Sequence, residues 1–189
     1  QEAKRHLELD ENTHYILFFG FIRDYKGLDL LIEAFREKNL QSLNVKLLIA
    51  GEFYSDEEKY LSLIEENKLG EFMEMRTDFI ADEEVRYYFS AADLVVQPYK
   101  TATQSGISQI AYHFNKPMIV TSVGGLPEIV PDGKVGFVVK KEPAEIANAI
   151  YRFYFEKLEQ FFSENCAEEK KKYSWDRMTN TINQLINLQ

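Results

Sequence analysis

Cysteine, basic charge and long apolar runs are all scarce in this chain of 189 residues. Cys166 is the only cysteine, so we predict no disulfide partner and no cysteine metal cluster, which fits a reducing compartment. His6, His14 and His113 are too scattered for a recognisable zinc-binding spacing. No apolar run reaches the roughly 18 residues that would predict a transmembrane helix. We therefore expect neither a bound metal nor a membrane-spanning segment.

Lysine and arginine number 22 against 31 acidic residues, which gives a net charge of -9. This balance argues against general nucleic-acid binding, because no excess of cations is available to displace counterions from phosphates. The first 15 residues contain no signal-peptide core and do not begin with Met, so we interpret the chain as a fragment or a processed product. We expect a cytoplasmic location, with the inner face of the membrane as the alternative for a full-length protein.

The chain is 45% hydrophobic and 14% aromatic, which suits one compact domain with a sizeable core. Short apolar runs typical of buried strands alternate with segments of helical periodicity. The predicted strands are 14–21, 45–53, 72–80, 93–99, 117–123 and 136–140. The predicted helices are 28–35, 56–69 with a cap at Ser55, 82–92 with a cap at Asp82, 105–115, one opened by Pro143, and two or three more to Gln189, broken near 172–174.

This alternation predicts an α/β fold with a doubly wound, Rossmann-like parallel sheet of about six strands and helices on both faces. Right-handed crossovers favour the strand order 3-2-1-4-5-6. The order reverses between the first and fourth strands, and ligands of such sheets bind there, outside the carboxyl ends of the strands. The loops at this point are 20–27 and 98–106.

The first of these loops, GFIRDYKG, places two cations close together in an acidic chain. Gly20 permits a tight exit from the strand, and Arg23 and Lys26 follow within six residues. Arginine can grip a phosphate in a two-pronged contact, while lysine acts as a point charge. The alternative is that both are ordinary exposed cations, and the position of the loop favours the functional interpretation.

The second loop, YKTATQSG, precedes a helix whose N-terminus can hold a phosphate. Thr103, Gln104 and Ser105 carry polar side chains, and Gly106 allows a ligand to approach the backbone closely. The alternative is a plain helix cap made by Ser105 or Thr103. Gln109, one turn into the helix, either reaches a sugar hydroxyl or is a surface residue.

A third loop, GGLPE at 124–128, offers paired glycines that can expose backbone amides to a ligand. Pro127 and Glu128 suit the first turn of a short helix. Glu128 therefore either holds a ligand hydroxyl or only complements the helix dipole, and the second role is slightly favoured.

Several segments, taken together, resemble the C-terminal, nucleotide-sugar-binding half of a GT-B glycosyltransferase of the retaining family 4. They include ILFFGFIRDYKGLDLLIEAF, VKLLIAGE and the long run from Gln104 to Val139, and they recur in order at 16–35, 45–52, 79–99, 104–139 and 173–178. The resemblance implies that residues 1–13 are an interdomain connection, 14–166 the nucleotide-sugar-binding domain, and 167–189 helices that return toward an N-terminal half. That half would bind a glycan or lipid-linked acceptor, so this chain alone would transfer nothing.

The resemblance also implies roles for the loop residues. Arg23 and Lys26 would neutralise the diphosphate of a nucleoside diphosphate sugar, and no metal cofactor would be needed. The expected donor-binding residues are Gly20, Phe79, Ile80, Gln104, Ser105, Gly106, Ile107, Gln109 and Glu128, with Phe79 and Ile80 near the base and the backbone amides of residues 105–107 on the diphosphate.

The chain departs from the family at two points. Many relatives carry two glutamates eight positions apart, but the expected positions hold Ala102 and Ile110. The family more often has arginine directly after the first glycine, and here that position is Phe21. Polar residues such as Gln104 or Gln109 would then substitute for the glutamates.

Two other function classes remain open at this point. A non-catalytic nucleotide-binding or scaffold domain that kept the fold is favoured by the missing glutamates and disfavoured by the retained cations and glycine loops. A nicotinamide-dependent enzyme is disfavoured, because no G-x-G-x-x-G follows the first strand.

Overall fold

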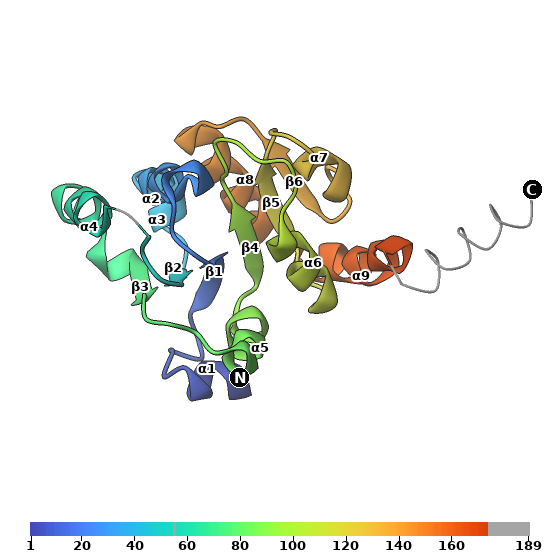
Figure 1. Cartoon of the computed structure of the whole chain (residues 1–189), viewed down its shortest axis with the longest axis horizontal. Helices are drawn as coiled ribbons and strands as arrows, with labels where there is room; N and C mark the ends of the chain where they lie inside the picture. The colour runs from blue at the N-terminus through green and yellow to red at the C-terminus, as the bar shows by residue number, and fades with distance from the viewer. Residues whose placement is uncertain (55, 174–189) are drawn as a thin grey trace, which may run out of the picture.

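A computed structural model describes residues 1–54 and 56–173 of the chain. It contains one parallel sheet of six strands in the order β3-β2-β1-β4-β5-β6, as predicted (Figure 1). The strands are β1 (His14–Phe19), β2 (Val45–Ala50), β3 (Met73–Arg76), β4 (Leu94–Gln97), β5 (Met118–Thr121) and β6 (Gly136–Val139). The doubly wound α/β fold expected from the sequence is therefore confirmed.

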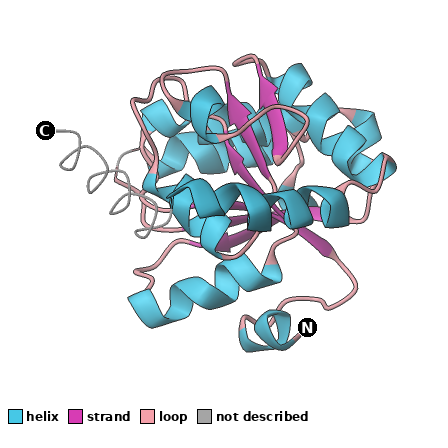
Figure 2. Cartoon of the chain, turned by 90° about the vertical axis from the view of Figure 1, so that its right-hand side faces the viewer, coloured by secondary structure: helices cyan, strands magenta, loops and turns pink. Residues whose placement is uncertain are grey.

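Helices cover both faces of the sheet, as Figure 2 shows. They are α1 (Glu2–His6), α2 (Leu28–Ala34), α3 (Lys38–Gln41), α4 (Glu57–Glu66), α5 (Asp82–Ala91), α6 (Gly106–His113), α7 (Leu126–Ile129), α8 (Pro143–Phe155) and α9 (Glu159–Glu169). Short 3-10 turns add η1 (Asp24–Lys26), η2 (Gly70–Phe72) and η3 (Lys170–Tyr173). None of the helices in the described part of the chain has the length and apolar character needed to cross a membrane.

The strands divide their side chains between two hydrophobic cores. In β1, Ile16 and Phe18 pack into a first core with α2, α4 and α8, while Tyr15 and Leu17 pack into a second core with α1, α5 and α6. This is the alternation of a strand with both faces buried, which explains why β1 has no polar residue between His14 and its end.

The helix boundaries differ from the sequence prediction in detail. Pro143 is the first residue of α8, as predicted. Asp82, however, is the first residue of α5 rather than its cap, and its side chain makes no capping hydrogen bond. At that position the carboxylate complements the positive end of the helix dipole instead. Helix α9 runs across residue 167. The predicted cap Ser55 and the residues after Tyr173 lie outside the described ranges.

Gly136, at the start of β6, lies so close to the backbone of the neighbouring strand that no side chain fits there. A β-carbon on this residue would lie 1.6 Å from the carbonyl oxygen of Met118, and the backbone φ of Gly136 is +154°. Only glycine therefore allows β6 to pair with β5 at this point.

We expect Gly136→Ala to lower the free energy of unfolding by about 3 kcal/mol or more, because the methyl group displaces the edge strand. Urea denaturation measures the change. Gly70→Ala is the matched control, because a β-carbon there meets no atom within 4 Å. Equal stability of the two variants would show that the contact at Gly136 is not limiting.

Candidate functional site

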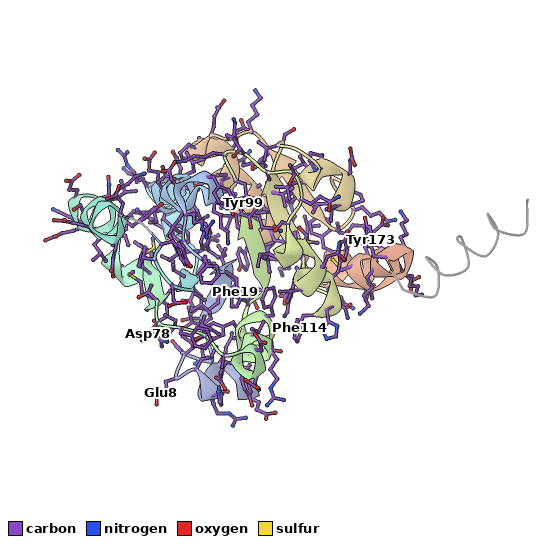
Figure 3. The ribbon with its side chains drawn as sticks, in the orientation of Figure 1. Glu8, Phe19, Asp78, Tyr99, Phe114 and Tyr173 are labelled. Carbon is purple, nitrogen blue, oxygen red and sulfur yellow. The ribbon has the colours of Figure 1, made fainter. Side chains whose placement is uncertain are left out.

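A pocket of about 600 Å³ opens at the carboxyl ends of β1 and β4, where the strand order reverses. Tyr99, labelled in Figure 3, stands at this end of β4. The two loops named from the sequence supply its walls, which consist of Tyr25, Lys26, Tyr99, Thr101, Ala102, Thr103, Gln104, Ser105, Gly106 and Ile107. The structure thus brings Lys26 and the second loop together across the switch point.

Lys26 is the charged side chain of this pocket, and it is only 8% exposed. Its ammonium makes no hydrogen bond or ion pair with any residue that the structure describes. Burial, and then the nearby charge of Arg23, lower the pKa of Lys26 from 10.5 to about 8. A buried cation without a partner destabilises the empty fold, so its position favours an anionic ligand.

Gly20 and Gly27 allow Lys26 to occupy this place. A β-carbon on Gly20 would lie 3.0 Å from the Lys26 Nζ and 3.5 Å from the Ile107 side chain. A β-carbon on Gly27 would lie 2.0 Å from the Pro98 carbonyl oxygen. The first loop can therefore pack against the second only because position 27 is glycine, and the φ of +92° at Gly20 likewise favours glycine there.

The second loop ends in a capped helix. The Ser105 Oγ accepts a hydrogen bond from the Ile107 N–H at 3.2 Å and lies 3.2 Å from the Tyr99 hydroxyl. Burial raises the pKa of Tyr99 to about 12, so this hydroxyl stays protonated. The N–H groups of Ser105 and Gly106 donate no hydrogen bond to a described residue, whereas that of Ile107 is occupied by the cap. Two of the three amides expected for a diphosphate are therefore available.

The third loop packs against the second loop and does not line the pocket. A β-carbon on Gly124 would lie 1.7 Å from the Ala102 carbonyl oxygen, and Gly124 has a φ of +51°. The Gly125 N–H donates to the Thr103 carbonyl oxygen at 2.9 Å. The expectation that the paired glycines expose their amides to a ligand is thus wrong for Gly125. Their small size is needed because the two backbones touch.

Other predicted site residues do not line this pocket. Arg23 stacks over the Tyr54 ring, with 4.5 Å between its guanidinium carbon and the ring centroid. Phe79 is 74% exposed, and Ile80 packs against the second core. The exposed side chains of Gln109 and Glu128 likewise lie outside the lining.

A group of ion pairs that the sequence analysis missed connects the two loops. The Lys100 Nζ contacts Asp24 at 2.9 Å and Asp29 at 2.8 Å, and the Lys59 Nζ contacts Asp24 at 2.8 Å. Hydrogen bonds from Lys59 and Lys100 lower the pKa of Asp24. These carboxylates are engaged with other lysines, so they leave the charge of Lys26 uncompensated. Nothing in the spacing of these four residues signals that they meet.

Comparison with known proteins agrees with this geometry. The family model described as "Glycosyl transferases group 1" matches residues 13–155, which is most of the chain. The chain belongs to the group 1 glycosyltransferases. It is 30% identical over 164 residues to an uncharacterized glycosyltransferase of Methanocaldococcus jannaschii, covering 85% of this chain but 44% of that relative. The chain therefore spans about half the length of the curated relatives that it matches.

Solved structures give the same fold. The C-terminal domain of the group 1 family protein LpcC from Francisella tularensis matches with a TM-score of 0.80 and 23% identity, covering 93% of both chains. Anabaena HepE in complex with UDP matches with a TM-score of 0.83 and 21% identity, covering all of this chain and 52% of HepE. This group 1 glycosyltransferase chain thus has the fold of a GT-B C-terminal domain.

We expect Lys26→Met to raise the free energy of unfolding at pH 7 by about 0.5–2 kcal/mol, because it removes an uncompensated buried charge. The pKa of Lys26 is about 8 in the fold against an ordinary 10.5, so the penalty is complete below pH 8. It shrinks as the pH rises toward 10.5, because only the unfolded chain then keeps the proton. Denaturation at pH 7 and pH 10 measures this. The exposed Lys140→Met is the control, and a pH-independent difference between the variants would contradict the assignment.

Proposed function

We propose that this chain is the donor-binding part of a retaining glycosyltransferase that takes a nucleoside diphosphate sugar. One observation carries the proposal. The buried, uncompensated cation Lys26 faces the N-terminus of α6 across a pocket of about 600 Å³. A diphosphate is the anion that matches this arrangement, because it can accept hydrogen bonds from both sides at once.

In the proposed complex, the Lys26 ammonium and the free N–H groups of Ser105 and Gly106 hold the diphosphate. The dipole of α6 adds partial positive charge at the same place. These groups stabilise the negative charge that develops on the diphosphate as the sugar leaves, so the reaction needs no metal ion. Arg23 adds to the positive potential from its stacked position beside Tyr54.

The donor sugar would lie beside Gln104, which lines the pocket close to the position where many relatives carry a glutamate. Its amide can donate to one sugar hydroxyl and accept from another. The UDP bound by Anabaena HepE favours UDP as the nucleotide to test first. A glycan or lipid-linked acceptor would need a further domain to be positioned for transfer, so we propose that this chain alone binds donor without transferring it.

The second candidate is a nucleotide-binding domain without transferase activity. The absence of any glutamate between Val85 and Pro127 favours it, since Gln104 cannot supply a negative charge. The two candidates differ in the behaviour of a longer protein that contains this chain. Sugar transfer that Lys26→Met abolishes supports the enzyme, whereas donor binding without transfer supports the alternative.

We expect UDP to bind this chain weakly and to shift the backbone amide resonances of Lys26 and Gly106 at millimolar concentration. Lys26→Met should weaken UDP binding by about 5- to 150-fold, which corresponds to the loss of one charged hydrogen-bonding contact. NMR titration measures both effects. Lys140→Met should bind like the unmodified chain, and the absence of any response to millimolar UDP would count heavily against the proposed function.

A further inference from the structure

Two exposed aromatic side chains and one arginine form a patch beside the pocket. Phe21 is 46% exposed and Tyr54 is 61% exposed, although both are large apolar rings. Their centroids lie 4.9 Å apart in an edge-to-face arrangement, and the Arg23 guanidinium stacks over Tyr54. We call Phe21, Arg23 and Tyr54 the aromatic platform.

The backbone holds the platform in place. Beyond the ends of β1 and β2, Ile22 and Phe53 form one more parallel bridge. The Ile22 N–H donates to the Glu52 carbonyl oxygen at 2.8 Å, and the Tyr54 N–H donates to the Ile22 carbonyl oxygen at 3.0 Å. Ile22 is buried in the first core, so the neighbouring residues Phe21 and Arg23 project to the opposite side.

Stacking within the platform restricts its rings before any ligand arrives. An edge-to-face pair and a cation over an aromatic face are each favourable, so these contacts restrict the positions of Phe21 and Tyr54. A binding surface that is ordered in advance loses less entropy when its ligand binds. The exposed platform is therefore suited to contact a ligand.

The platform adjoins the proposed diphosphate site. Phe21 directly follows Gly20, and a β-carbon on Gly20 would lie 3.0 Å from the Lys26 Nζ. In a nucleoside diphosphate sugar, the anomeric carbon of the transferred sugar is bonded to an oxygen of the terminal phosphate. The acceptor must approach that anomeric carbon. A sugar held at that diphosphate site would therefore come within reach of the platform.

We propose that the aromatic platform binds the pyranose ring of a sugar substrate, an inference that rests on the proposed function. The C–H face of a pyranose is apolar and packs against an aromatic ring, while its hydroxyl groups need hydrogen-bond partners. Phe21 and Tyr54 supply the apolar contact, and the guanidinium of Arg23 supplies several donors at its edge. The ring belongs either to the donor or to the acceptor, and the two sources are separable.

The donor arm compares affinities of the unmodified chain, Phe21→Ala and Tyr54→Ala for UDP, UDP-glucose and UDP-N-acetylglucosamine. If the donor sugar occupies the platform, both variants lose about 3- to 10-fold in affinity for a UDP-sugar and none for UDP. Phe21→Tyr, which keeps the ring, should bind like the unmodified chain. So should Phe155→Ala, which removes a 68% exposed aromatic at the end of α8.

The acceptor arm uses saturation-transfer NMR with maltose in the presence of UDP. If the acceptor sugar occupies the platform, maltose ring protons receive saturation from the unmodified chain, and this signal is lost in Phe21→Ala and Tyr54→Ala. A positive result in either arm supports the proposal and names the source of the ring. If UDP binds but neither arm responds, the platform does not bind sugar, and a protein surface becomes its partner while the proposed function stands. If UDP itself does not bind, the proposed function fails and this inference fails with it.

Discussion

The pairing of β1 with β4 in the middle of the sheet is the constraint on which the site depends. The partners Ile16–Leu94 and Leu17–Val95 bring the two strands side by side, although 74 residues separate their closest ends in the chain. The helices that follow them, α2 and α6, pack into opposite cores. The two loops therefore lead to helices on opposite faces of the sheet, and the space between the loops is a pocket lined by backbone and polar side chains.

Close backbone contacts give this pocket its shape. They also bury Lys26, so the residue that lowers the stability of the empty fold is the one proposed to bind the ligand. Glycines at positions 27 and 124 let three loops approach within distances that a methyl group would prevent. The ammonium of Lys26 occupies the space left beside Gly20, where burial lowers its pKa. This side chain destabilises the empty protein, and an anion such as the proposed diphosphate would stabilise it.

Among the residues that the structure describes, ion pairs outside the pocket engage Lys59 and Lys100 but not Lys26. Lys100 and Lys59 share the carboxylates of Asp24 and Asp29, which fastens the first loop to the start of the second. Arg23 lies against Tyr54 and raises the positive potential without entering the pocket. The arrangement keeps Lys26 free for a ligand and leaves an ordered aromatic surface at the rim, in a family whose members act on sugars.

Local patterns in the sequence determined the strands, their order and the two loops that line the pocket, because apolar periodicity is set by nearby residues and right-handed crossovers limit the possible strand orders. They also placed Ser105 at the start of a helix, where it is the cap. Only the tertiary structure decided that Arg23 turns toward Tyr54, that Gly125 bonds to Thr103, and that Phe79 lies outside the pocket. These outcomes depend on contacts between distant segments, and a side chain with several accessible directions is oriented by neighbours that the local sequence does not specify.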